Sequence, residues 1–78
     1  MRGHLEKRSF TLAGHRTSVA LEPAFWEALE EEAARRGTTL LRLVAEADAV
    51  RADPTLPLAS ALRLHALAAA RAAAPQSQ

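Results

Sequence analysis

Few side chains in this sequence have types and spacings that could do catalytic or metal chemistry. The three histidines, His4, His15 and His65, stand far apart and lack the spacing of metal ligands. Cysteine is absent, which excludes a thiolate nucleophile, a disulfide and a thiolate metal site. There is no glycine-rich phosphate loop and no plausible serine, histidine and aspartate triad. We therefore expect a protein that is not an enzyme and that uses no cofactor or metal.

Residues 16–21 include two side chains, Arg16 and Ser18, that could hydrogen-bond a ligand and that are two positions apart. Because successive side chains of a strand point to opposite faces, this segment predicts a strand with two different faces. One face holds Arg16, Ser18 and Ala20, and the other holds Thr17, Val19 and Leu21. A lone short strand cannot satisfy its own backbone hydrogen bonds, and the economical partner is the same strand of a second copy. Such a two-stranded ribbon is of the kind that fits a major groove of DNA.

A second possible contact point for an anion lies where a helix is expected to begin, at residues 37–39. The Thr39 hydroxyl would cap that helix by accepting a hydrogen bond from a first-turn N–H. The unpaired N–H groups and the helix dipole would favour a bound phosphate beside Thr38 and Thr39, with Arg42 nearby. Ordinary capping explains the same residues without any ligand, so both interpretations stay open.

The charges are distributed unevenly, although the net charge is only +1. Residues 1–16 carry four basic side chains against one glutamate, which gives +3. Residues 22–36 carry five glutamates against two arginines, which gives −3. A polyanion would be attracted to the first segment and repelled by the second. Both segments could equally be solvated surface, so charge alone does not decide the function.

Residues 9–12 could form another short strand, with Phe10 and Leu12 on one face. One continuous strand cannot keep Phe10 and Val19 on the same side, because the alternation has a period of two residues. The register must therefore break near Gly14, by a turn or a bulge. A two-residue hairpin at Ala13-Gly14 would restore a common apolar face, although alanine is a poor residue for such turns.

Two helices are expected after these strands. The first begins at Pro23, which suits the first helical position, and ends before Gly37, which suits the left-handed position after a helix. Its apolar stripe comprises Phe25, Trp26, Leu29 and Ala33. The second helix follows Thr39, and its apolar face comprises Leu40, Leu43, Val44, Ala47 and Val50.

The chain is expected to divide into a core and short flanking segments. Pro54 and Pro57 exclude a continuous helix between the core and a third, alanine-rich helix. The segments are a flexible basic N-terminus (1–8), the core (9–52), a proline-containing linker (53–57), a C-terminal helix (58–74) and a tail (75–78). No run of about 18 apolar residues exists, so we expect no membrane span. The lack of cysteine agrees with a cytoplasmic location.

With these elements in order, the chain resembles a ribbon-helix-helix protein, of the superfamily of the Arc and Met repressors. It is most similar to small bacterial ribbon-helix-helix domain-containing proteins, over residues 9 to about 67. The motifs that carry the resemblance are Gly14-His15-Arg16-Thr17-Ser18-Val19, Leu21-Glu22-Pro23, Phe25-Trp26, Ala28-Leu29, Gly37, Leu43-Val44-Ala45-Glu46 and Ser60-Ala61-Leu62-Arg63. The resemblance implies a mainly α fold with a short β-ribbon, extended by an additional C-terminal helix.

The resemblance also implies an intertwined homodimer that binds double-stranded DNA and regulates transcription as a repressor does. By this analogy the base contacts are Arg16, Ser18 and Ala20, and the phosphate contacts are Thr38, Thr39, Arg42, Lys7 and Arg8. The implied dimer core comprises Thr17, Val19, Leu21, Phe25, Trp26, Leu29, Leu43, Val44 and Ala47. Ala20 and Glu32 depart from the pattern, because a longer polar residue and an apolar residue are expected there.

A protein-interaction module is the alternative function. In it the core serves only for dimerisation, as in an antitoxin or an adaptor, and two dimers could assemble further. The C-terminal helix over residues 58–74 would present Leu64, Leu67 and its alanines to a protein partner. The five glutamates of residues 22–36 favour this alternative, because they would repel DNA.

Overall fold

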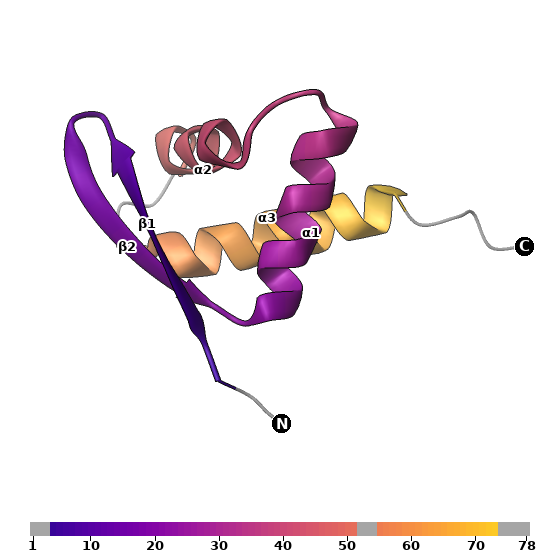
Figure 1. Ribbon diagram of the computed structural model, residues 1–78, viewed down its shortest axis with the longest axis horizontal. Coiled ribbons are helices and arrows are strands. Elements are labelled where there is room, and N and C mark those ends of the chain that lie inside the picture. The colour runs from indigo at the N-terminus through magenta and orange to yellow at the C-terminus, as the bar shows by residue number, and fades with distance from the viewer. Residues whose placement is uncertain (1–3, 52–54, 74–78) are drawn as a thin grey trace, which may run out of the picture.

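Two strands and three helices follow one another in the computed structural model, which describes residues 4–51 and 55–73 (Figure 1). They are β1 (Glu6–Leu12), β2 (His15–Leu21), α1 (Pro23–Arg35), α2 (Leu40–Ala49) and α3 (Leu58–Ala73). The expected fold class, a short ribbon and helices with an additional C-terminal helix, is confirmed. The last residue of the expected core (52), the start of the expected linker (53–54), the last residue of the expected C-terminal helix (74) and the expected tail (75–78) lie outside the described residues. None of the described helices is long and apolar enough to cross a membrane.

The strand that pairs with β2 comes from the same chain. β1 and β2 are antiparallel, and their register runs from Glu6 opposite Leu21 to Leu12 opposite His15. The expectation that β2 depends on a second copy for its backbone partner is therefore wrong, because β1 supplies that partner. β1 also begins at Glu6, earlier than the strand expected over residues 9–12, so the ribbon includes part of the segment expected to be flexible.

A two-residue turn at Ala13 and Gly14 joins the two strands. Both residues have positive φ angles, 50° and 83°. Two consecutive positive φ angles define a type I′ turn, whose twist matches that of the strands it connects. The hairpin alternative is thus confirmed, and Phe10 and Val19 share the inner face of the ribbon, as that alternative requires.

The turn leads to a first prediction, because Ala13 adopts a backbone conformation that alanine disfavours. An L-residue with a Cβ atom is strained in the left-handed region, whereas asparagine tolerates it and is preferred there in type I′ turns. We expect Ala13→Asn to raise the free energy of unfolding by about 0.5–1 kcal/mol. Urea unfolding of the two proteins measures the change. As a control, the β-branched Ala13→Val should be destabilised, and a less stable Asn variant would contradict the turn geometry.

The reversal between α1 and α2 uses the capping residues that the sequence predicts. Gly37 has a φ of 67°, and the N–H of Thr38 donates to the carbonyl oxygen of Ala33 at 2.9 Å. This is the hydrogen bond of a helix that ends in a left-handed residue. Thr39 then caps α2, since its Oγ1 accepts a hydrogen bond from the N–H of Arg42 at 3.1 Å. The short reversal brings the start of α2 next to the hairpin turn.

A single chain encloses the hydrophobic core. Its largest fully buried side chains are Leu21, Trp26, Leu29, Leu43, Val44 and Leu62. α3 belongs to this core, because its four buried residues face the rest of the chain and it packs across α1 (Figure 1). Of the residues expected to form a dimer core, only Thr17 and Phe25 are not fully buried within one chain, and both are half-buried. These side chains are therefore shielded from water by their own chain, without contact with a second copy.

An ion pair at the surface joins α3 to the start of α1. The Nε of Arg63 donates to Glu22 Oε1 at 3.0 Å, and the guanidinium lies 5.9 Å from the centre of the Phe25 ring. The hydrogen bond from Arg63 lowers the pKa of Glu22 below its ordinary value. The ion pair therefore stabilises the fold at pH values above the ordinary pKa of a glutamate. This stabilisation is lost as the pH falls through the lowered pKa of Glu22. Both groups are substantially exposed, so the pair contributes little to stability.

Candidate nucleic-acid interface

The outer face of the hairpin is polar along both strands. Its cross-strand pairs are Lys7 with Ala20, Ser9 with Ser18, and Thr11 with Arg16. All of these residues are exposed except Ala20, which is half-buried. At the centre, the Oγ atoms of Ser9 and Ser18 lie 2.9 Å apart and share a hydrogen bond. The three residues expected to contact bases therefore lie together on one accessible face.

Two residues of this face, Ser9 and Thr11, were not among the candidate residues from the sequence. The sequence does contain a signal for them, because polar and apolar side chains alternate from Ser9 to Leu12. The sequence also permits a bulge at Gly14, and a bulge would assign these side chains to another face than the hairpin does. The hairpin places them beside the outward residues of β2.

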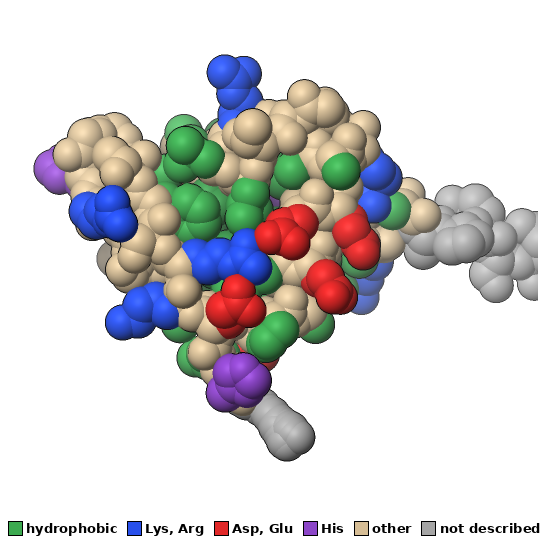
Figure 2. Space-filling view, viewed as in Figure 1, with side chains coloured by type: hydrophobic (Ala, Val, Ile, Leu, Met, Phe, Trp, Pro, Cys, Tyr) green, Lys and Arg blue, Asp and Glu red, His purple; other side chains and the backbone are tan. Residues whose placement is uncertain are grey.

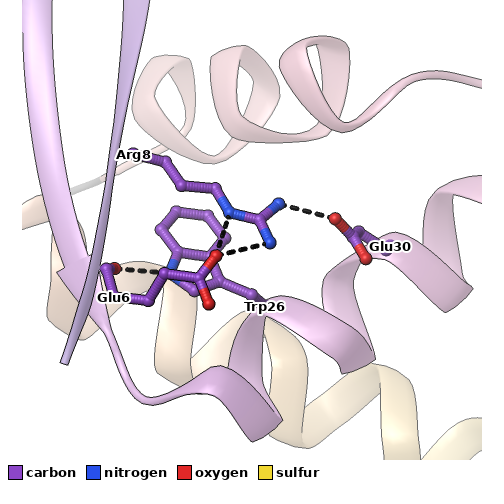
Figure 3. A network of polar contacts seen from close by, with 4 residues as sticks. All are labelled: Glu6, Arg8, Trp26 and Glu30. Carbon is purple, nitrogen blue, oxygen red and sulfur yellow. Dashed lines mark hydrogen bonds and ion pairs between the residues drawn. The ribbon is translucent and has the colours of Figure 1, made fainter. Parts of the chain in front are cut away.

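Arg8 lies on the inner face of the hairpin and holds β1 against α1 (Figure 3). Its Nε donates to Glu6 Oε2 at 2.8 Å, and its NH1 donates to Glu30 Oε2 at 2.5 Å. The guanidinium also lies 4.9 Å from the ring centre of Trp26, at a distance typical of a cation–π contact. The indole Nε1 of Trp26 donates in turn to the carbonyl oxygen of Glu6 at 2.7 Å. Four residues thus fasten the first strand to the first helix.

This network separates Arg8 from the other expected phosphate contacts. The hydrogen bond to Glu30 is the largest cause that raises the pKa of Arg8 above its ordinary value, so the side chain stays charged. It already has two carboxylate partners, and contact with a phosphate would require it to leave them. Lys7, its neighbour in sequence, points to the opposite face. The structure therefore does not bring Lys7 and Arg8 together.

The remaining basic side chains fall into a paired and an unpaired group. Among the described residues, ion pairs with carboxylates are made by Arg8, Arg35, Arg36, Arg51 and Arg63. The described basic side chains without such a pair are Lys7, Arg16, Arg42 and Arg71. Three of these four lie on the outer face of the hairpin or in the first turn of α2. The uncompensated positive charge is therefore concentrated where the sequence predicts contacts with DNA.

Acidic side chains gather on a different part of the surface. In Figure 2 red side chains cover the region of α1 at the centre, whereas blue side chains line the hairpin at the left and project near α2 at the top. On α1, Glu27 and Glu31 are exposed and make no ion pair with any described residue. A polyanion would therefore approach the hairpin from its outer side, away from α1.

The start of α2 and the tip of the hairpin line one open hollow of about 580 Å³. Thr38, Thr39 and Arg42 line it from the helix side, and Thr11 and Ala13 line it from the hairpin. The first N–H groups of a helix have no partner within the helix and favour an anion. The expected phosphate contacts of α2 are thus brought together, and they open toward the same side as the hairpin tip.

The histidines lie apart from one another and from this hollow. His4 and His15 are exposed, and His65 is half-buried on α3. Within residues 4–51 and 55–73, no group of three histidine, cysteine or acidic side chains could hold a metal ion. The outer face of the hairpin and the hollow present hydroxyl groups and cationic side chains, among them Ser18, Thr39 and Arg42.

A β-ribbon with a polar outer face, followed by two capped helices, defines a ribbon-helix-helix type of domain. The comparison with known families agrees, because the model of the family described as "Ribbon-helix-helix domain" matches residues 5–70. The chain belongs to this ribbon-helix-helix domain family. No curated protein matches the chain.

A solved structure is also similar to this chain. It is that of an uncharacterized protein from Bordetella pertussis Tohama I, which is 36% identical in sequence and superimposes with a TM-score of 0.69. The match covers 81% of this chain and 53% of the other. The chain therefore corresponds to about half of that protein.

Proposed function

We propose that this protein binds double-stranded DNA and regulates transcription, with the outer face of its ribbon in the major groove. The observation that carries the proposal is the position of the unpaired cations. Lys7 and Arg16 flank the hydroxyl groups of the outer face, and Arg42 lies in the first turn of α2. Every other described arginine except Arg71 is neutralised by a carboxylate. Membership of the ribbon-helix-helix domain family supports the same function.

The side chains on the two surfaces have different roles in this proposal. Arg16 bonds a guanine through two hydrogen bonds, Ser18 bonds a base edge, and Ala20 contacts a thymine methyl group. Lys7, Arg42 and the start of α2 at Thr38 and Thr39 bind phosphates on either side of the groove. A protein with this role acts on the chromosome, in the cytoplasm of a bacterial cell.

The proposal includes a homodimer, which would double the number of phosphate contacts at one DNA site. Because the core is closed within each chain, the two copies would meet through surfaces outside it. Within the described part of the chain, the large apolar side chains that remain exposed are Leu5, Leu41, Val50, Leu64 and Leu67. An interface between copies would remove some of them from water.

A salt titration of binding to random-sequence duplex DNA tests the proposal. Each neutralised phosphate contributes about −0.9 to the slope of log K against log salt concentration. We expect a steep slope for the natural protein, made shallower by about 0.9 per chain in Lys7→Gln and in Arg42→Gln. Arg71→Gln is the matched control, since Arg71 is also exposed and unpaired but lies on α3, and it should leave the slope unchanged. Absence of binding at low salt would refute the proposal.

A protein-interaction module is the second candidate, and an exposed apolar patch favours it. Leu64 on α3 and Val50 after α2 are 61% and 77% exposed, and they line one open hollow together with Leu56. Leu67 continues the patch along α3 and is 45% exposed. If the folded protein does not bind DNA at low salt, that result would favour the protein-interaction module over DNA binding.

A further inference from the structure

Glu6, Arg8, Trp26 and Glu30 form a polar network on the inner side of the hairpin, away from the proposed DNA contacts (Figure 3). We infer that Arg8 is a positioning residue for DNA binding, which fixes the orientation of the hairpin relative to α1 and does not touch the DNA. The inference rests on the proposed function, because the orientation matters only if the hairpin binds a ligand. It gives Arg8 a role that differs from the phosphate contact expected from the sequence.

Long side chains span the space between β1 and α1. Arg8 reaches from β1 to Glu30 on α1, with NH1 and Oε2 2.5 Å apart. Trp26 reaches back from α1 to the carbonyl oxygen of Glu6 at 2.7 Å. Between the residues of the hairpin (6–21) and those of α1, these are the two polar contacts. Arg8 makes one of them and also lies against the ring of Trp26, which makes the other.

The orientation of the hairpin matters because two surfaces have to reach the DNA at the same time. In the proposed function the outer face of the hairpin enters the groove, and the start of α2 lies at the phosphates. Both surfaces border one open hollow, lined by Thr11 on the hairpin and by Thr39 at the start of α2. Groups that bind one ligand together have to be held within about 0.5 Å of the productive geometry. A hairpin held at a fixed angle also loses less conformational freedom on binding, which favours affinity.

The charges of the network separate a positioning role from a purely electrostatic one. Glu6 and Glu30 together carry one negative charge more than Arg8 neutralises, so the three side chains repel a polyanion. Electrostatics alone therefore predicts that Glu30→Gln strengthens DNA binding, because the substitution removes a negative charge and releases Arg8. The positioning role predicts weaker binding, because Glu30 is the residue of α1 that holds Arg8. The sign of one change in affinity thus decides between the two roles.

The experiment selects a duplex from a randomised DNA library with the full chain and compares variants on it. We expect Glu30→Gln to bind this duplex about two- to fivefold more weakly than the natural protein, the range that partly exposed ion pairs set. Glu31→Gln is the matched control, since Glu31 is the next residue of α1, is exposed and makes no ion pair with any described residue. It should bind as tightly as the natural protein or more tightly. Thermal unfolding monitored by circular dichroism verifies that each variant is folded.

Arg8→Gln tests the inference from the other side of the ion pair. It should weaken binding at least as much as Glu30→Gln does, because it removes both carboxylate contacts and the cation–π contact. The slope of log K against log salt concentration should stay unchanged, since no phosphate contact is lost. A phosphate-contacting arginine would instead make the slope shallower by about 0.9 per chain.

The fluorescence of Trp26 shows where Arg8 lies when DNA is bound. Trp26 is the only tryptophan of the chain, so its emission reports on this network. Arg8→Gln removes the cation beside the ring and should shift the emission of the free protein. Addition of the selected duplex to the natural protein should leave the emission maximum unchanged, because Arg8 stays with Glu6 and Glu30. This readout follows the position of Arg8 in the folded protein and not the stability of the fold.

Three results would overturn the inference and leave the proposed function standing, because the natural protein binds DNA in each. The first is a Glu30→Gln variant that binds as tightly as Glu31→Gln. The second is a shallower salt slope for Arg8→Gln. The third is a shift of the Trp26 emission on DNA binding that equals the shift caused by Arg8→Gln. No binding of the natural protein to any duplex at low salt would refute the proposed function and the inference together.

Discussion

Trp26→Ala is expected to lower the free energy of unfolding by about 3–5 kcal/mol, as truncation of a buried large aromatic residue does. Trp26 is 1% exposed, and its ring centre lies 5.8 Å from that of Phe10. The substitution also removes the cation–π contact with Arg8 and the hydrogen bond to the backbone of Glu6. A loss of this size is a large part of the total stability of a small domain. Urea unfolding followed by far-ultraviolet circular dichroism measures it.

Two further variants show which part of the Trp26 side chain matters. Trp26→Phe keeps most of the apolar volume and removes the N–H donor, so it should cost less than the alanine variant. Phe25→Ala is the matched control, because the neighbouring ring is only half-buried and should cost less than Trp26→Ala. A loss below about 1 kcal/mol for Trp26→Ala would contradict the packing of β1 onto α1 through this residue.

Arg16→Ala is expected to weaken binding to a selected DNA sequence by about 1–3 kcal/mol, the usual value of a bidentate contact with guanine. On a scrambled duplex the loss should be smaller, because only the charge contribution is removed there. Arg16→Ala should also weaken the protein's preference for guanine at one position of the selected DNA sequence. Fluorescence anisotropy with both duplexes at one fixed salt concentration measures the two losses.

Arg71→Ala is the control for Arg16→Ala, since it removes the same charge from an exposed and unpaired position on α3. It should leave both affinities nearly unchanged. Losses of equal size on the selected and the scrambled duplex would show that Arg16 contacts a phosphate instead of a base. Its role in the proposed function would then be the same as that of Lys7.

The helical part of the fold could be predicted because its signals are local. Pro23, Gly37 and Thr39 mark helix ends through their own backbone and side-chain chemistry, and all three lie where the sequence places them. The buried stripe of α1 follows in the same way from a period of 3.6 residues. Local chemistry thus accounts for the elements that carry the phosphate contacts at the start of α2.

The hairpin was harder to predict because alanine at its first turn position argues against it. Sequence statistics of primed turns favour asparagine, aspartate or glycine at that position, whereas here Ala13 adopts the positive φ. Seven paired residues on each strand and the packing of Phe10 and Leu12 outweigh the local strain. Tertiary contacts therefore override a weak turn signal, and an analysis of local propensity cannot include them.

The role of Arg8 illustrates the same difficulty for the candidate site. As a basic residue in a basic segment it was expected to contact a phosphate. Its partner Glu30 is 22 positions away in the sequence, and no local pattern indicates that they meet. The residues that were assigned by strand parity alone, Arg16 and Ser18, do lie on the exposed face. The alternation of side chains along a strand predicts the face on which each residue lies. It does not predict which charged side chains form ion pairs with residues far away in the sequence.

The closure of the ribbon and the core within one polypeptide has a consequence for how the protein is made. Since one chain covers its own core, we expect a newly synthesised copy to fold in a unimolecular reaction, at a rate that does not depend on concentration. An obligate intertwined dimer has to associate in order to fold, so its stability falls on dilution. Because the buried side chains of this protein are covered within one chain, we expect its free energy of unfolding to stay constant on dilution, which urea unfolding at two protein concentrations measures.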